Sequence, residues 1–315
     1  MIKLIFVALF LCSFPAMAEF PDRMIRFIVP FPAGTLTDIV GRKVADEMRK
    51  DLNQVVVVEN KPGAFGVVGG QALLSAPADG YTVMLVGVTT AASNVTLLKK
   101  LPFDPLKDFS PIGFVAEFPF FLVARPGLQV NNISELVAYG RQNPGKLTFA
   151  SGASSSQVAA AQLASVLGIQ VTPVLYLSAA KALNDVMGER VDLLMADIAL
   201  AMPQARAGKV KGLGVSSRER FALAPEVPTL NEAGVPGFEM IVWFGLVSAA
   251  KVPPEITAKL SASLARSVKS DSLVKNFAAQ GVAARSSTAS EFGAFLNSEV
   301  HRWAKMIKEA GIEPQ

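Results

Sequence analysis

The chain has 315 residues, of which 51% are hydrophobic and 18% are charged, and its 30 Lys and Arg residues exceed its 26 Asp and Glu residues by four. The basic residues are scattered, which excludes the clustered basic face of a nucleic-acid-binding protein. The single cysteine, Cys12, excludes an intrachain disulfide and a thiolate metal site. The mild positive charge favours the attraction of small anions.

The N-terminal segment, residues 1–18, has the layout of a secretory signal peptide. Lys3 precedes an apolar run over residues 4–11, and the small-residue triplet Ala16-Met17-Ala18 follows. The alternative is an uncleaved membrane anchor. It is disfavoured because the apolar run has about eight residues, whereas a spanning helix needs about twenty. We therefore expect this segment to be removed, so that the mature protein begins near Glu19 in the periplasm.

From Met24 onward, short apolar runs rich in β-branched residues alternate with amphipathic stretches. The apolar runs predict strands over Ile25–Val29, Val55–Val58, Thr82–Val86, Leu147–Ala150, Val191–Met195 and Gly212–Val215. The amphipathic stretches predict helices over Asp38–Lys50, Ala64–Leu74, Ile133–Arg141, Ser156–Leu167, Ala179–Met187 and Leu200–Ala207. Strands that alternate with helices of this length indicate βαβ units, and therefore an α/β fold with a parallel sheet.

After Pro253 the pattern changes to helices alone. These are predicted over Pro254–Ser270, Asp271–Ala279 and Ala289–Ala310. We expect this helical tail to pack on the first half of the chain, which makes that half discontinuous in sequence. The expected organisation is therefore two lobes, with residues 19–122 and 244–315 in the first and residues 123–243 in the second.

The first informative turn joins the strand predicted at Ile25–Val29 to the helix that follows it. It consists of proline and small residues over Pro32–Thr35. Such a turn leaves the first N–H groups of the helix unpaired at the positive end of the helix dipole, which suits an anion. Asp38 follows the turn and has two interpretations. It either accepts a hydrogen bond from a ligand or is an ordinary acidic residue in the first turn of a helix.

A second turn of the same kind, Ser151–Ser156, follows the strand predicted at Leu147–Ala150. Its serines are either helix caps or ligand contacts. Ligands of open parallel sheets bind beyond the carboxyl ends of the strands, so one turn from each lobe can face the other across a cleft. A hydrogen bond to a carboxylate contributes about 1.5–3 kcal/mol. A few such contacts would therefore give micromolar binding without an arginine.

Short motifs follow one another in order along almost the whole chain after the signal segment. They are Phe20-Pro21-Asp22-Arg23, Ile25-Arg26, Val29-Pro30-Phe31-Pro32-Ala33-Gly34, Val57-Val58-Glu59-Asn60-Lys61-Pro62-Gly63-Ala64, Asp79-Gly80-Tyr81-Thr82, Leu101-Pro102-Phe103-Asp104-Pro105, Asp108-Phe109-Ser110-Pro111-Ile112, Pro144-Gly145-Lys146-Leu147, Pro228-Thr229-Leu230-Asn231-Glu232-Ala233-Gly234 and the ending Glu299, Arg302 and Trp303. This set resembles the substrate-binding proteins of tripartite tricarboxylate transporters, known as the Bug family. The resemblance implies a two-lobed periplasmic receptor with the type II, Venus flytrap fold. Its ligand would be a small carboxylate, commonly a dicarboxylic or tricarboxylic acid, an acidic amino acid or an aromatic acid, which it delivers to a membrane permease.

The resemblance also implies where the ligand lies. In the family, the first turn holds a carboxylate through backbone N–H groups and ordered waters, and an acidic residue at the position of Asp38 adds polar contacts. The loop Gly87–Ala91 lines the cleft. The predicted ligand-binding residues are Phe31, Pro32, Ala33, Gly34, Thr35, Asp38, Thr89, Ser151, Ala153, Ser154, Ser155, Ser156, Tyr176 and Asp197.

The second lobe departs from the family pattern. Ala153 and Ser155 stand where the family has glycines, and Ala159 stands where it has a histidine. Tyr176 is all that remains of a more polar motif, and Asp197 occupies a position that is commonly polar. These changes remove backbone freedom and polar groups from one side of the cleft. We therefore expect a ligand that is less charged or more apolar than citrate.

An enzyme is the disfavoured alternative. The only histidine, His301, lies in the last predicted helix, where a solvated or packing role is expected. The sequence has no Gly-x-Ser-x-Gly elbow, paired-histidine metal motif, phosphate-binding loop or dinucleotide fingerprint, so we expect neither a cofactor nor a metal. A ligand sensor for a membrane signalling receptor would need the same cleft and stays open. We expect a monomer.

Overall fold

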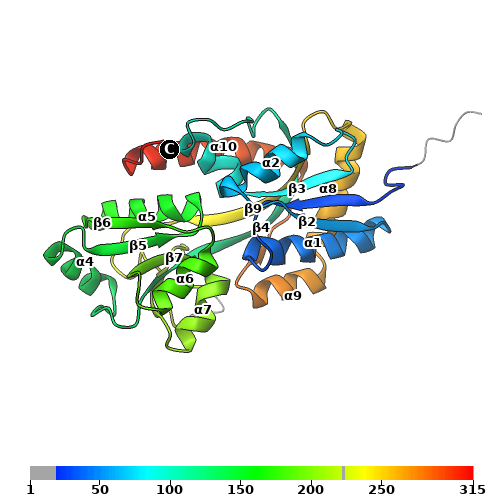
Figure 1. Cartoon of the computed structure of the whole chain (residues 1–315). Coiled ribbons are helices and arrows are strands. Elements are labelled where there is room, and N and C mark those ends of the chain that lie inside the picture. The colour runs from blue at the N-terminus through cyan, green and yellow to red at the C-terminus, as the bar shows by residue number, and fades with distance from the viewer. Residues whose placement is uncertain (1–18, 222–223, 315) are drawn as a thin grey trace, which may run out of the picture.

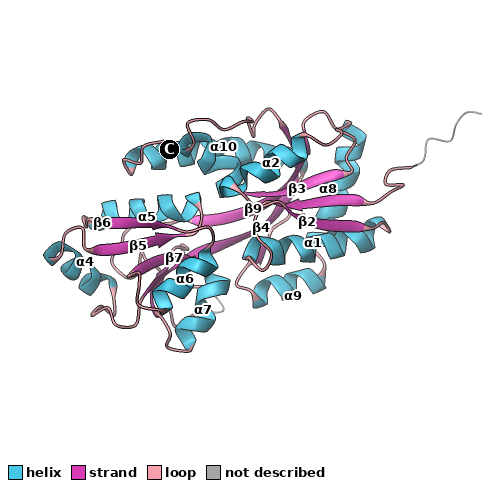
Figure 2. Cartoon of the chain, viewed as in Figure 1, coloured by secondary structure: helices cyan, strands magenta, loops and turns pink. Residues whose placement is uncertain are grey.

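The computed structural model describes residues 19–221 and 224–314. Within these residues the protein is an α/β structure in which one curved sheet runs through two groups of helices (Figures 1 and 2). The predicted signal segment, residues 1–18, lies outside the described part. The two-lobed α/β fold expected from the sequence is confirmed, whereas the limits of the lobes stay a prediction.

The first lobe contains a parallel sheet with β1 in its centre, paired with β2 on one side and β3 on the other. Its elements in chain order are β1 (Ile25–Val29), α1 (Leu36–Leu52), β2 (Val56–Asn60), a 3-10 turn (Ala64–Gly66), α2 (Val67–Leu74), β3 (Thr82–Gly87), a π-helical turn (Thr89–Ser93) and α3 (Asn94–Leu97). Every residue of β3 is buried. This agrees with the apolar runs of the sequence, since strands covered by helices on both faces need apolar residues on both faces.

The second lobe repeats the alternation of strand and helix. Its elements in chain order are α4 (Ile133–Gln142), β5 (Leu147–Ser151), α5 (Ser154–Leu167), β6 (Val171–Leu175), α6 (Ala179–Met187), β7 (Leu193–Asp197), α7 (Ile198–Arg206) and β8 (Lys211–Val215). β5 pairs in parallel with β6 and β7. The carboxyl ends of these strands therefore meet at one edge, where α5, α6 and α7 begin.

Two strands pass between the lobes, as Figure 1 shows, and the sequence predicts neither as a strand. They are β4 (Phe109–Ala124) and β9 (Ile241–Ala249). The first part of β4 pairs antiparallel with β9, and its last part pairs antiparallel with β7 and β8. Since β9 is also antiparallel to β3, the sheet is mixed. The prediction of a parallel sheet is correct within each lobe and wrong for the crossing strands.

The strand order of the sheet is β2-β1-β3-β9-β4-β7-β5-β6, with β8 and the short β10 (Ala283–Ala284) also paired to β4. The C-terminal helices are α8 (Pro254–Val268), α9 (Asp271–Ala279) and α10 (Ala289–Glu309). α8 packs on α1 and β4, whereas α10 packs on β4, the π-helical turn and α5. The helical tail therefore contacts elements of both lobes. No helix in the described part of the chain is both long and apolar enough to cross a membrane.

A buried acidic residue joins α10 to β9. Glu299 Oε2 accepts hydrogen bonds from the indole N–H groups of Trp243, at 2.7 Å, and Trp303, at 3.0 Å. Arg302 donates to Glu299 Oε1 at 2.9 Å. These donors satisfy a carboxylate that would otherwise be costly to bury, so the last helix is held against the crossing strand.

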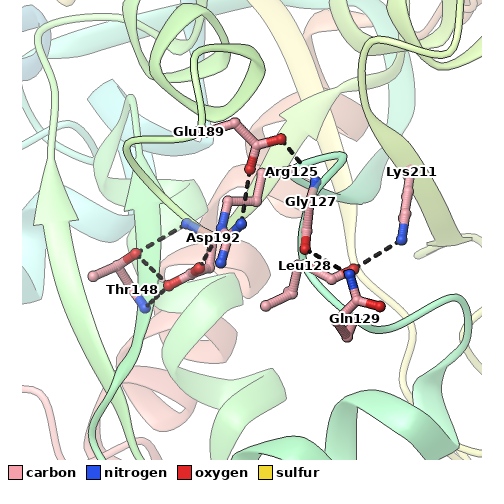
Figure 3. Close-up of polar contacts among 8 residues, drawn as sticks. All are labelled: Arg125, Gly127, Leu128, Gln129, Thr148, Glu189, Asp192 and Lys211. Carbon is pink, nitrogen blue, oxygen red and sulfur yellow. Dashed lines mark hydrogen bonds and ion pairs between the residues drawn. The ribbon is translucent and has the colours of Figure 1, made fainter.

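A polar network joins β4, β5 and β7 of the second lobe (Figure 3). Arg125, just after β4, donates to Asp192 at 2.7 Å and to Glu189 at 2.7 Å. The backbone N–H and hydroxyl of Thr148 donate to Asp192 at 2.8 and 2.7 Å. Burial would raise the pKa of Asp192, but the bonds from Thr148 and Arg125 outweigh burial and lower it. Asp192 precedes β7, so the network holds the first end of this strand, whereas Asp197 is its last residue.

Candidate functional site

A cavity that is partly open to solvent lies where the two lobes meet. The starts of α1, α5, α6 and α7 line it, together with the turn after β3 and parts of the crossing strands. Its lining residues are Phe31, Gly34, Thr35, Leu36, Thr37, Gly87, Val88, Thr89, Phe118, Phe120, Gly152, Ala153, Ser155, Ser156, Ser178, Ala179, Ala180, Met195, Asp197, Leu200, Val242 and Phe244.

Helix α1 begins at Leu36, two residues earlier than the sequence predicts. Thr35 is its N-cap, and the Thr35 hydroxyl accepts from the N–H of Asp38 at 3.4 Å and donates to the Pro32 carbonyl at 2.8 Å. Gly34 adopts a φ of +80°, which glycine tolerates best. The N–H groups of Leu36 and Thr37 have no partner among the described residues, and both residues line the cavity. The turn therefore presents two free donors to the cavity, as expected for an anion site.

Asp38 does not line the cavity, and its carboxylate is fully engaged by the protein. Oδ2 accepts from the Gly34 N–H at 2.9 Å and from Arg42 Nε at 3.1 Å, and Oδ1 accepts from Asn60 at 2.8 Å. Burial alone would raise the pKa of Asp38, but these donors outweigh burial and lower it. Asp38 therefore holds the turn that carries Gly34, and its direct contact with a ligand stays a prediction.

Helix α5 begins at Ser154, again two residues earlier than predicted. The hydroxyl of Ser156 accepts from the N–H groups of Gly152 and Ala153, both at 3.2 Å, and donates to the Ala153 carbonyl at 2.9 Å. A Cβ on Gly152 would lie 2.1 Å from the backbone nitrogen of Ala179. Glycine is therefore required here so that the starts of α5 and α6 can lie side by side.

Five buried polar residues connect the turn of α5 to the segment after β3. Thr89 donates to Ser155 at 3.1 Å, the hydroxyls of Ser93 and Ser154 lie 2.7 Å apart, and Ser154 donates to Asn94 at 2.9 Å. We call this group the inter-lobe hydroxyl cluster. Thr89 and Ser155 line the cavity, but Ser154 does not. The hydroxyl of Ser154 serves the contact between the lobes, and a contact of Ser154 with a ligand stays a prediction.

Asp197 is the last residue of β7 and the N-cap of α7, and it lines the cavity. Burial raises the pKa of its carboxyl from 3.8 to about 6. No described residue donates a hydrogen bond to this carboxyl, and none forms an ion pair with it. Asp197 therefore lines the cavity as an acidic group without a partner among the described residues. The sequence could not predict this lack of a partner.

Four further predicted residues do not line the cavity. Pro32 and Ala33 lie in the first turn beside the lining residues. The hydroxyl of Ser151 is buried and has no partner among the described residues. The hydroxyl of Tyr176 donates to Asp185 of α6 at 2.9 Å. The predicted residues that do meet at the cavity are Phe31, Gly34, Thr35, Thr89, Ala153, Ser155, Ser156 and Asp197.

The profile of the family described as "Tripartite tricarboxylate transporter family receptor" matches residues 40–312 of this chain. The chain belongs to this family. The receptor is also 32% identical over 316 residues to the protein BugT of Bordetella pertussis, an alignment that covers 98% of this chain and 96% of BugT. An Agrobacterium vitis protein from the ttuE-ttuC' intergenic region is 33% identical over 303 residues, covering 94% of this chain and 87% of its own. The resemblance seen in the sequence motifs is thereby confirmed.

Solved structures superpose on almost the whole receptor. An R. palustris protein solved with adipate has a TM-score of 0.90 at 29% identity, covering 94% of this chain and 100% of its own. The periplasmic binding protein BugD has a TM-score of 0.87 at 32% identity, with coverages of 94% and 100%. MatC from Rhodopseudomonas palustris with bound malate has a TM-score of 0.85 at 30% identity, with coverages of 91% and 100%.

Several residues of the cavity wall are not among the ligand-binding residues predicted from the sequence. Ser178 caps α6, and Ala179 and Ala180 follow it into the cavity. This is a third turn from strand to helix, and a strand prediction over β6 would have revealed it. Four phenylalanines also line the wall, two of them, Phe118 and Phe244, with ring centroids 5.3 Å apart. The crossing strands β4 and β9 supply most of these rings. No local sequence motif predicts those two strands.

Proposed function

We propose that this receptor captures a small carboxylate in the inter-lobe cavity, in the periplasm, and delivers it to a membrane permease of the tripartite tricarboxylate type. The observation that carries the proposal is the meeting of the starts of α1, α5 and α6 around a cavity whose walls contain no Arg, Lys or His. Anions bind at helix N-termini through free N–H groups and the helix dipole. The relatives solved with adipate and malate support a carboxylate as that anion.

The strength of binding expected from this arrangement is adequate for a receptor. Hydrogen bonds to a charged acceptor contribute about 1.5–3 kcal/mol each, and a partly buried helix end adds up to about 2 kcal/mol. Micromolar affinity corresponds to about 8 kcal/mol. A few backbone and hydroxyl donors therefore suffice.

The test is a thermal-shift screen of the mature protein, beginning at Glu19, against carboxylic acids. The protein is first unfolded and refolded to remove any ligand carried through purification. A true ligand at a hundred times its dissociation constant adds about 2.7 kcal/mol of stability, which raises the melting temperature by several degrees. The ligand should be recovered chemically unchanged. A screen in which no carboxylate shifts the melting temperature contradicts the proposal.

A matched pair of variants locates the binding to the cavity. Ala180→Phe places a ring in the cavity and should abolish the shift, because Ala180 lies at its wall in the first turn of α6. Ala278→Phe places the same ring on the exposed face of α9 and should leave the shift intact. If both variants respond to the ligand as the wild type does, the carboxylate binds elsewhere.

A further inference from the structure

Asp197 differs in its hydrogen bonding from three other buried or partly buried acidic residues of the receptor. Asp38, Asp192 and Glu299 each receive at least three hydrogen bonds from other residues. Asp197 receives none from the described residues, although it is the one ionisable residue in the cavity wall. A carboxyl left without a donor in a largely apolar cavity is costly unless a partner arrives. Because Asp197 lines the cavity, a molecule in the cavity could reach its carboxyl.

The cavity therefore offers two kinds of polar surface. The starts of α1, α5 and α6 present N–H groups and hydroxyls, which suit a carboxylate. The start of α7 is different, because its N-cap is the acidic Asp197, which offsets the positive end of that helix. A second carboxylate placed here would meet a like charge with no cation to balance it, whereas an ammonium group would meet an opposite charge.

The rest of the wall fits an apolar carbon skeleton. Phe31, Phe118, Phe120 and Phe244 line it, as do Leu36, Val88, Met195, Leu200 and Val242. Phe120 is paired directly with Asp197 across β4 and β7, so an aromatic ring lies beside the carboxyl. The polar groups of a ligand would therefore be separated by carbon atoms in contact with rings and aliphatic side chains.

We propose that the ligand is an amino-carboxylate with an apolar carbon skeleton, whose carboxylate lies at the starts of α1, α5 and α6 and whose ammonium lies against Asp197. This deepens the proposed function and rests on it. Asp197 is then the residue that determines specificity, since it favours a zwitterion over a dicarboxylate of the same length. The zwitterion has no net charge, so it does not need a cationic residue in the cavity wall to balance it.

The test is calorimetric binding at pH 7.5 to four acids with the same six-carbon chain: adipate, hexanoate, 6-aminohexanoate and norleucine. At least one of the two amino-carboxylates should bind tenfold or more tightly than both adipate and hexanoate. Asp197→Asn should remove that preference, because the amide keeps the shape of the side chain but not its charge. A cooperative melting transition of the variant without ligand shows that it is folded.

The outcomes separate this inference from the proposed function. Binding of adipate or hexanoate as tight as that of the amino-carboxylates overturns the inference alone, and so does an amino preference that survives in Asp197→Asn. The failure of these four acids and of the whole carboxylate screen overturns both. A preference that disappears with the charge of Asp197 supports the inference.

Discussion

Two aspartates at helix starts have opposite surroundings, and the sequence could not tell them apart. Asp38 receives donors from Gly34, Arg42 and Asn60. Asn60 comes from β2, and its approach to Asp38 depends on the parallel pairing of β1 and β2. Asp197 has no such neighbour. The turn before α1 could be predicted because its residues are contiguous. The roles of the two carboxyls could not, since they depend on strand pairing.

The engagement of Asp38 predicts a loss of stability when it is removed. Asp38→Ala should lower the free energy of unfolding by about 2–3 kcal/mol, because it leaves the Gly34 N–H and Arg42 Nε without their acceptor. Urea unfolding of the ligand-free protein measures this. Asp46→Ala, on the exposed face of the same helix, should change stability by less than about 0.5 kcal/mol. An Asp38→Ala protein of unchanged stability but weakened ligand binding would support the direct role predicted from the sequence.

The isolation of Asp197 predicts a stability that depends on pH. Its pKa is about 6 in the folded protein and 3.8 in the reference state. Between these values the unfolded chain releases its proton first, so the contribution of Asp197 to stability falls as the pH rises and is fully lost above about pH 6.5. The loss is about 3 kcal/mol. The stability of Asp197→Asn relative to the wild type should therefore increase from pH 4 to pH 6.5 in ligand-free protein. A constant difference across this range would show that the carboxyl is better solvated than the geometry indicates.

At the scale of elements, the sequence pattern predicts the structure well where helices and strands alternate. It does not predict the two strands that pass between the lobes, β4 and β9. β1 is found with its observed limits, because it is a short apolar run between turn residues. β4 is missed, because Pro111, Gly113 and Pro119 interrupt it and are unusual inside a strand. The structure accommodates them with register shifts against β9 between Pro111 and Gly113 and between Phe114 and Ala116. Only the tertiary pairing reveals β4 as one strand.

The inter-lobe hydroxyl cluster predicts a measurable coupling between the start of α5 and the segment after β3. Ser154→Ala should destabilise the protein by about 1–3 kcal/mol, because it leaves the buried Asn94 and Ser93 with one partner fewer. In a double-mutant cycle with Ser93→Ala, the interaction energy should be about 1 kcal/mol. Ser165→Ala, on the exposed face of α5, is the matched control. Additive effects of the two substitutions would mean that the short Ser93–Ser154 contact contributes no stability.

At the scale of the whole molecule, the receptor is one sheet shared by two lobes, with a cavity where the sheet passes between them. The family resemblance predicted this architecture, while the alternation of elements predicted only its α/β class. The alternation of elements does not predict the character of this cavity. Phenylalanines and helix starts without basic residues line it, together with Asp197, whose carboxyl has no partner among the described residues. They are the basis for expecting an amino-carboxylate rather than citrate.

The shared strand β4 has a consequence for the order in which the protein folds. The segment Phe109–Pro119 of β4 pairs with β9. This segment cannot form its pairing until Ile241–Ala249, more than a hundred residues later in the chain, has been synthesised. Folding dominated by such distant pairings is slow. During synthesis the chain therefore stays without its central sheet until most of its length has emerged.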